Sequence, residues 1–274
     1  DGKNSGNWAV NFEHGFYDGN GGILSLTATG SNINFGNDGT PSHVQYNGSG
    51  TSCLAGPPWE QKLTGALFIN SGTLELCQDQ IYLNASGDGV TVAGGTLDLT
   101  GSTGAHKFDK LVITSGTFKA PQYLEIEGSG AGKLTWSGGS FVHNYGTVEV
   151  TGNNGTGINI AGTSGNLYNL ILNNGECDIC SISMLGVSTS APAIIEGDLT
   201  AKRGTIIPNT STHDYTIYGT TTIESIATFN NASTSGDWIH YGTVINYGEY
   251  TISSKTNTYY GGIINRGTFN SNST

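Results

Sequence analysis

The chain has 274 residues, enough for one large or two ordinary domains with hydrophobic cores. It contains 43 glycines but only 6 prolines, and 11% of its residues are charged, which excludes collagen and argues against a disordered chain. A formal net charge of −11 argues against nucleic acid and anionic membranes as partners. No apolar run approaches the roughly 18 residues that a membrane span needs, so no membrane insertion is expected.

Short alternating segments predict β-strands along the whole chain. Residues 74–76 (Leu-Glu-Leu), 97–99 (Leu-Asp-Leu) and 148–150 (Val-Glu-Val) place every second side chain on one face. No stretch of about 11 residues shows the apolar spacing of a helix. We therefore predict an all-β fold.

Residues 1–62 repeat least clearly and are expected to form N-terminal variant coils or a cap, whereas residues 63–274 are expected to form one continuous domain. In the second part, Gly72-Thr73, Gly95-Thr96, Gly116-Thr117 and Gly139-Ser140 each precede an alternating strand, at nearly constant spacings of roughly 21 to 23 residues. A period of about 20 to 23 residues fits one coil of a parallel β-helix, and the chain is long enough for roughly a dozen coils. The alternative is a β-sandwich, which would show turns at intervals of about 8 to 12 residues without the longer repeat.

Two segments carry a resemblance to a known class of proteins. Residues 138–150 (Gly-Gly-Ser-Phe-Val-His-Asn-Tyr-Gly-Thr-Val-Glu-Val) and 167–174 (Leu-Tyr-Asn-Leu-Ile-Leu-Asn-Asn) resemble the degenerate repeats of large secreted β-solenoid surface proteins of bacteria and archaea. These adhesin-like chains are grouped with pectin-lyase-like folds. The resemblance covers residues 65–175 and, more loosely, 200–270. It implies a secreted, cell-surface and usually non-enzymatic role. A narrower candidate, based on composition and cysteine content, is an envelope subunit such as those of the sheaths of some methanogenic archaea.

Four cysteines predict disulfides, because an even count in an exported protein favours disulfides over free thiols. The chain begins with Asp1, and we expect a processed product whose export signal has been removed. The interval between Cys53 and Cys77 is close to the length of one coil, which predicts a bridge between neighbouring coils. Cys177 and Cys180 are expected to clip a loop locally, and an intermolecular bridge stays open as an alternative.

A column of charged side chains is predicted at one repeat position. Glu75, Asp98 and Lys119 occupy matching places on successive coils, about 5 Å apart. We expect a solvated charge ladder relieved by Lys119, with a cation site at Glu75 and Asp98 as the alternative. Polysaccharide lyases and hydrolases of the β-helix type also place acids on adjacent coils, so this class is an alternative function.

No catalytic or cofactor motif is found, so we expect neither catalytic residues nor a cofactor. The segment 128–134 (Gly-Ser-Gly-Ala-Gly-Lys-Leu) superficially resembles a phosphate-binding loop. It has Glu127 in place of the first glycine and Leu134 in place of the hydroxyl residue that would ligate magnesium. A turn between coils is the better interpretation.

Two kinds of residue point to glycans. Glycosylation triplets occur at six asparagines, which are candidates if the source glycosylates its proteins: Asn47, Asn84, Asn154, Asn209, Asn231 and Asn272. Aromatic rings stack on sugar faces, and a strip of tyrosines is expected to form such a surface, although tyrosine ladders also stabilise solenoids without any ligand: Tyr145, Tyr241, Tyr247, Tyr259 and Tyr260. Cell-surface glycans are therefore candidate partners of an adhesin or carbohydrate-binding module.

The C-terminal repeats predict an unguarded strand edge. The pattern of residues 244–248 recurs at 263–267, and no helix, proline or charge run follows. Ile263, Ile264, Thr268 and Phe269 are expected to form an edge to which another copy adds strands. The predicted function is thus a non-enzymatic extracellular structural protein that assembles into an envelope layer, sheath or fibre. Alternatively, this is a stretch of a longer solenoid whose further coils cover the edge.

Overall fold

A computed structural model describes the following parts of the chain: residues 8–11, 22–27, 29–35, 43–55, 60–78, 82–85, 88–128, 130, 132–152, 156–160, 166–174, 181–185, 193–208, 214–231, 236–252 and 256–271. These residues form strands and turns and no helix, and the strands pair in parallel as a β-solenoid of about nine turns. The all-β parallel solenoid predicted from the repeats is confirmed.

The chain divides into two compact units, Asp1–Leu124 with Gly138–Asn144, and Glu125–Ser137 with Tyr145–Thr274. Strands of the first unit are β1 (Trp8–Asn11), β2 (Ile23–Leu26), β3 (Asn32–Asn34), β4 (His43–Leu54), β5 (Glu60–Lys62), β6 (Leu67–Leu76), β7 (Tyr82–Ala85), β8 (Val90–Val92), β9 (Thr96–Asp98), β10 (His106–Phe108), β11 (Leu111–Ile113), β12 (Thr117–Lys119) and β15 (Ser140–Val142). Strand β13 (Tyr123–Ile126) spans the division in the sequence.

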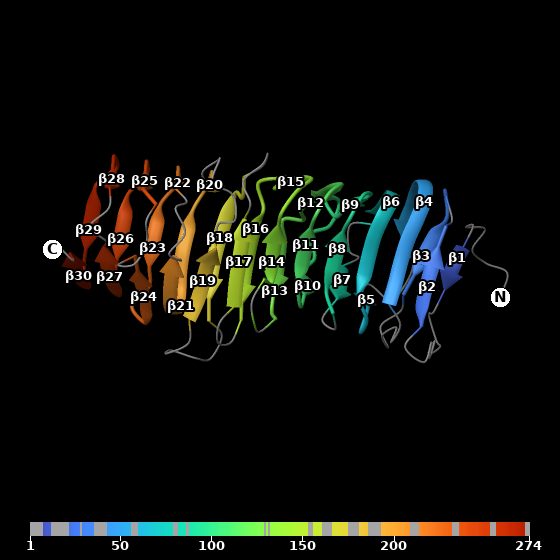
Figure 1. Ribbon diagram of the computed structural model, residues 1–274, viewed down its shortest axis with the longest axis horizontal. Helices are drawn as coiled ribbons and strands as arrows, with labels where there is room; N and C mark the ends of the chain where they lie inside the picture. The colour runs from blue at the N-terminus through green and yellow to red at the C-terminus, as the bar shows by residue number, and fades with distance from the viewer. Residues whose placement is uncertain are drawn as a thin grey trace. The chain divides into compact units, whose positions relative to one another are not determined.

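Strands of the second unit are β14 (Leu134–Trp136), β16 (Thr147–Thr151), β17 (Thr156–Ile160), β18 (Asn169–Asn173), β19 (Ser181–Leu185), β20 (Ala193–Ile195), β21 (Leu199–Pro208), β22 (Tyr215–Ile217), β23 (Thr221–Ile223), β24 (Ala227–Asn230), β25 (Trp238–His240), β26 (Val244–Asn246), β27 (Glu249–Ile252), β28 (Asn257–Tyr259), β29 (Ile263–Asn265) and β30 (Thr268–Ser271). Figure 1 shows these strands side by side within each unit.

The alternation of the sequence becomes the core of the first unit. Leu74, Leu97, Phe118 and Phe141 pair in register on β6, β9, β12 and β15, and each is at most 2% exposed. On each strand, the residues directly before and after the buried one lie on the opposite, outer face. Parallel stacking of like residues in this way buries a continuous apolar column, because each strand presents every second side chain to the interior.

Glycines at the corner before these strands let the coils approach closely. Gly72, Gly116 and Gly139 have φ near +70°, a conformation that residues with a side chain rarely adopt. A Cβ atom on Gly139 would lie 2.5 Å from the carbonyl oxygen of Gly116, one coil away. The Gly-Thr and Gly-Ser pairs therefore repeat because this corner has no room for a side chain.

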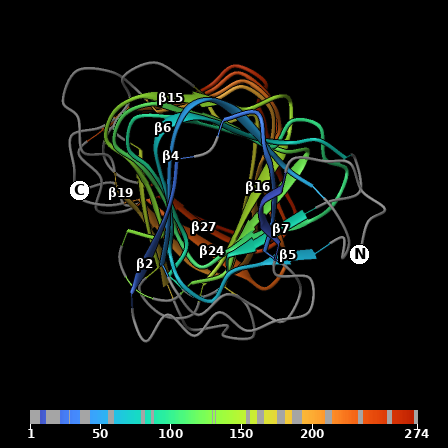
Figure 2. The same ribbon diagram turned by 90° about the vertical axis from the view of Figure 1, so that its right-hand side faces the viewer.

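The second unit contains strands of two different sheets. Its strands β20, β22, β25 and β28 form a separate parallel sheet, while β21, β23, β26 and β29 pair on another face. Figure 2 shows β24 lying over β27, in agreement with their register. Aromatic side chains fill the interior here, where Phe229 and Tyr250 are each 1% exposed and pair in register.

Coil length explains why the roughly dozen coils predicted are too many. Residues joined across one coil are 19 apart at Asn246 and Asn265 but 30 apart at Asn166 and Glu196. Because some coils contain more residues than the shortest repeats, the same chain length forms fewer coils. The predicted division at residues 62 and 63 stays a prediction, and β4 and β6 on its two sides pair in parallel.

Candidate functional site

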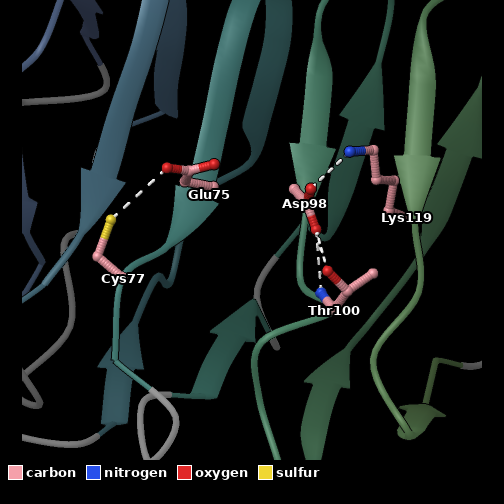
Figure 3. Close-up of polar contacts among 5 residues, drawn as sticks. All are labelled: Glu75, Cys77, Asp98, Thr100 and Lys119. Atoms are coloured by element: carbon pink, nitrogen blue, oxygen red, sulfur yellow. Dashed lines mark hydrogen bonds and ion pairs between the residues drawn. The ribbon is translucent and has the colours of Figure 1, made fainter. Parts of the chain in front are cut away.

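The predicted column of charges forms in the register expected. Glu75 pairs with Asp98, and Asp98 pairs with Lys119, on β6, β9 and β12 (Figure 3). Lys119 Nζ donates to Asp98 Oδ2 at 2.7 Å, while the backbone nitrogen and Oγ1 of Thr100 donate to Asp98 Oδ1 at 3.1 and 2.6 Å. Asp98 is thus held by an ammonium group and by its own turn.

The electrostatics of this column fit a charge ladder. Partial burial acts to raise the pKa of Asp98, but the hydrogen bonds from Lys119 and Thr100 outweigh it, so the pKa lies below its ordinary value of 3.8. The carboxylate is therefore ionised at neutral pH and paired. A cation shared with Glu75 stays a prediction, and it would have to displace Lys119.

A cluster of residue types that commonly ligate metals includes Glu75 of this column and two cysteines. Donor atoms of Cys53, Glu75 and Cys77 lie within 4.8 Å of one another. The two cysteines form a disulfide with a Cα–Cα distance of 5.4 Å, so they offer no thiolate to a metal. The 3.8 Å contact between Cys77 and Glu75 in Figure 3 is no hydrogen bond for the same reason, because the bonded sulfur has no proton. Glu75 alone is left as a ligand.

The disulfide between Cys53 and Cys77 is the bridge predicted from their spacing. It joins β4 to the residue that follows β6, one coil further on. Cys177 and Cys180 lie outside the described residues, so their local clip stays a prediction.

Three glycosylation candidates lie among the described residues, and all use their amide nitrogens within the coil stack. Asn47 donates to Ser25, Asn84 donates to Glu60, and Asn231 donates to Asn257. Asn231 is also fully buried. Glycosylation at these positions stays a prediction, and a glycan would have to break these bonds. Asn154, Asn209 and Asn272 lie outside the described residues.

An exposed column of tyrosines runs along the second unit. Tyr218, Tyr241 and Tyr260 directly follow β22, β25 and β28, whose last residues pair in register. Their ring centroids are 4.9 Å apart at both steps, with interplanar angles of 6° and 13°. The rings are 50%, 45% and 67% exposed. We call these three residues the tyrosine column.

Glycines make the tyrosine column compact. Gly219, Gly242 and Gly261 follow the three tyrosines, and a Cβ atom on Gly242 or Gly261 would clash with the backbone of the preceding coil. Because the rings lie face to face, both faces of Tyr241 are covered by its neighbours. The column therefore presents ring edges and hydroxyl groups to solvent, and a sugar cannot stack on the face of Tyr241.

The predicted aromatic strip is therefore only partly assembled. Tyr241 and Tyr260 belong to the column, while Tyr259 is directed to the interior and its hydroxyl lies 2.8 Å from that of Tyr250. Tyr247 lies against Arg266, whose guanidinium carbon is 5.6 Å from the ring centroid. Sequence reasoning missed Tyr218. The signal was present, because Tyr-Gly-Thr occurs at residues 145–147, 218–220 and 241–243.

The four residues of the predicted edge lie on the last described coil. Ile263 and Ile264 on β29 are 37% and 46% exposed, whereas Val244, which pairs with Ile263, is fully buried. Thr268 is exposed and Phe269 is half-buried on β30. The edge thus carries side chains that are covered one coil earlier.

The backbone hydrogen bonds define what this edge offers. Leu199 N donates to Thr220 O, Thr221 N donates to Thr243 O, and Val244 N donates to Gly262 O, each to the next coil. Ile263 occupies the next place in this series. Its N–H group points away from β26, and no described residue lies beyond it to accept.

Two shallow grooves in the second unit each contain one acidic side chain. Glu224 lines one with Lys202 and Ile226, and Glu249 lines the other with Tyr247. Glu249 Oε1 accepts a hydrogen bond from Asn270 at 2.9 Å. Among the described lining residues, neither groove contains the pair of carboxyl groups that glycoside hydrolysis requires.

Comparison with known proteins finds no matching family model, no matching curated protein and no matching solved structure. The fold alone defines the class, which is a parallel β-solenoid. The described residues include no helix with the length and apolar character needed to cross a membrane.

Proposed function

We propose that this chain is a non-enzymatic extracellular structural protein that assembles through its exposed strand edge into an envelope layer, sheath or fibre. The partner is a further copy of the chain, whose coil adds to β28, β29 and β30. The N–H of Ile263, for which the described part of the chain provides no acceptor, carries this proposal. It continues a series of donors that each bind the next coil, and unpaired strand edges are templates for pairing.

The exposure of the last described coil supports the same proposal. Tyr250 is 1% exposed and contacts Phe269 at a centroid distance of 5.4 Å, while Phe269 itself remains half-buried. Tyr260 is the most exposed ring of the tyrosine column. One more coil would bury apolar surface on all three faces, and such burial is the main driving force of association.

The disulfide supports an extracellular location. Bridges such as Cys53–Cys77 form and persist in oxidising compartments and are rare in the cytosol. A net charge of −11 also keeps separate copies soluble before they assemble.

Proline at the edge tests the proposal. Ile263→Pro removes the N–H that an added coil would accept from, and proline is tolerated at the first residue of a strand. Electron microscopy and light scattering of the purified chain should show fibres or sheets that this variant fails to form. Ile263→Ala keeps the N–H and should still assemble. Discrete monomers of the unmodified chain, or equal assembly of both variants, would contradict the proposal.

A glycan-binding role is the second candidate, and one residue favours it. Tyr145 is 71% exposed and has φ of +54°, a backbone conformation that is costly for a residue with a side chain. Strained residues of this kind cluster at functional sites. On a glycan array, Tyr145→Ala should lose any binding that Tyr247→Ala retains. The lyase alternative is tested by the absorbance of unsaturated products released from acidic polysaccharides.

A further inference from the structure

We propose that the tyrosine column is a site of oxidative cross-linking, at which a haem peroxidase with hydrogen peroxide couples Tyr218 to Tyr241 and Tyr241 to Tyr260. The products are dityrosines that join successive coils of the second unit. This inference does not depend on assembly between copies, because all three rings belong to one chain.

Stacking places the reacting carbons side by side. The two steps of the column have equal centroid distances of 4.9 Å and nearly parallel rings. Residues paired in register on parallel strands are related by a near translation, so the ortho carbons of each ring lie beside those of the next. Dityrosine forms by a bond between two ortho carbons. Rotation about the side-chain bonds of these exposed residues is enough to bring them together.

The backbone holds the partners at this separation. Tyr218 N donates to Ile195 O at 2.9 Å, Tyr241 N donates to Ile217 O at 2.8 Å, and Tyr260 N donates to His240 O at 2.8 Å. Each bond ties one coil to the coil before it. The rings are thus neighbours in the folded chain whatever the protein concentration, which favours coupling within a chain over coupling between chains.

Exposure separates the tyrosine column from two buried tyrosines of the second unit. The column rings are about half or more exposed, so an external oxidant reaches their phenol groups. Tyr215 and Tyr250 are 4% and 1% exposed and lie in the interior. An external oxidant can therefore reach the stacked rings of the tyrosine column but not the buried rings of Tyr215 and Tyr250.

The chemistry balances with hydrogen peroxide as the oxidant. Each phenol gives up its hydroxyl proton and one electron, which yields two tyrosyl radicals, and the peroxide is reduced to two water molecules. The radicals combine at their ortho carbons to form one carbon–carbon bond. The hydrogen atom on each joined carbon then moves to the phenol oxygen and restores the aromatic ring. Each link removes one hydrogen atom from each of the two tyrosines that it joins, so Tyr241 loses two when both links form, and each link consumes one molecule of peroxide.

Ring orientation supplies an internal comparison. Tyr145 and Tyr168 have a centroid distance of 5.2 Å, similar to that in the column, but their planes are 82° apart. The edge of one ring then faces the flat side of the other, so the ortho carbons do not meet. Proximity alone would couple this pair, whereas parallel stacking predicts coupling in the column only.

The test uses the purified chain at a concentration where light scattering shows monomers, treated with a haem peroxidase and hydrogen peroxide. Dityrosine fluorescence should appear. After denaturation, a protease that cuts after acidic residues cleaves at Glu224, Asp237 and Glu249, which places the three tyrosines on separate peptides. Mass spectrometry should find the Tyr241 peptide linked to the Tyr218 peptide and to the Tyr260 peptide, with two hydrogen atoms lost for each link. A chain that carries both links should give all three peptides joined, lighter by four hydrogen atoms.

Phenylalanine variants keep the stacked ring and remove the phenol. Tyr241→Phe should abolish both links, and Tyr218→Phe should abolish only the first. Tyr247→Phe is the matched control, an exposed tyrosine outside the column, and should keep both. Absence of dityrosine, links at Tyr145 and Tyr168 in equal yield, or links only between chains would overturn the proposal. None of these results depends on whether the chain assembles through Ile263.

Discussion

Two histidines lie in the interior of the stack and are held neutral there. His106 is fully buried, and its Nδ1 accepts a hydrogen bond from Leu83 N at 3.0 Å. His240 is 1% exposed, with Nδ1 2.9 Å from Thr221 Oγ1. Burial lowers the pKa of His106 to about 3 and the pKa of His240 to about 4, from an ordinary value of 6.5. The folded chain therefore resists their protonation.

This burial predicts a loss of stability in mild acid. Because the folded pKa values lie below 6.5, the unfolded chain binds more protons, and the free energy of unfolding falls as the pH drops from 6.5 towards 4 and 3. The stabilisation is fully present above pH 6.5. For His240 the loss near pH 4 is on the order of 3 kcal/mol.

Denaturant unfolding at several pH values measures this effect. His240→Gln removes one of the two titrating groups and should reduce the slope between pH 6.5 and 4 by about half, because His106 still titrates over the same range. An equal slope in the unmodified chain and in His240→Gln would show that other groups cause the acid sensitivity.

In the turns between strands, two separate constraints require glycine. One is a positive φ angle, and the other is the close approach of the neighbouring coil. Gly139 has φ of +70° and no room for a Cβ atom, which would meet Gly116 O at 2.5 Å. Gly30 has φ of +69° but nothing within 4 Å of a Cβ atom. The two positions share a left-handed conformation that would strain a residue with a side chain, and they differ in the space available to a Cβ atom.

Alanine substitutions at Gly30 and Gly139 separate the cost of the left-handed conformation from the cost of the steric clash between coils. Gly30→Ala should lower the free energy of unfolding by about 1–2 kcal/mol, the cost of a left-handed conformation for a residue with a side chain. Gly139→Ala should cost more, because the coils must also move apart. Urea unfolding measures both. Equal losses would contradict the claim that coil spacing depends on this corner.

The same corner shows what the sequence can predict. Gly72, Gly95, Gly116 and Gly139 repeat at nearly constant spacing, so the register of Glu75, Asp98 and Lys119 and the Cys53–Cys77 bridge followed from counting residues. Counting works only where coil length is constant. The coil of 30 residues between Asn166 and Glu196 breaks the period, and the number of turns was therefore overestimated.

The tyrosine column shows what the sequence could not predict. Tyr-Gly-Thr repeats indicate that the tyrosines share a corner, but they do not give the angle between the rings. Tyr145 and Tyr218 both precede Gly-Thr, yet Tyr218 lies parallel to Tyr241 whereas Tyr145 lies nearly perpendicular to Tyr168. This angle decides whether ring faces are open to a sugar, so the glycan prediction depended on information that spacing alone lacks.

For the whole molecule, the balance between edge pairing and net charge should govern assembly. Copies that each carry a charge of −11 repel one another at neutral pH, whereas the proposed contact at Ile263 is made by backbone hydrogen bonds and apolar side chains, which salt screens little. Salt reduces the Debye length to about 10 Å at 0.1 M and should weaken the repulsion more than the contact. Assembly should therefore become faster and begin at lower protein concentration as salt is added at pH 7.

Light scattering at increasing sodium chloride concentration measures the rate of assembly and the protein concentration at which it begins. Ile263→Pro provides the control. Screening removes repulsion but cannot restore a missing N–H group, so the variant should stay unassembled at every salt concentration at which the unmodified chain assembles. Faster assembly at low salt would mean that opposite charges on two copies attract. The contact would then lie on a charged face of the coil, since Arg266 is the one charged residue among positions 256–271.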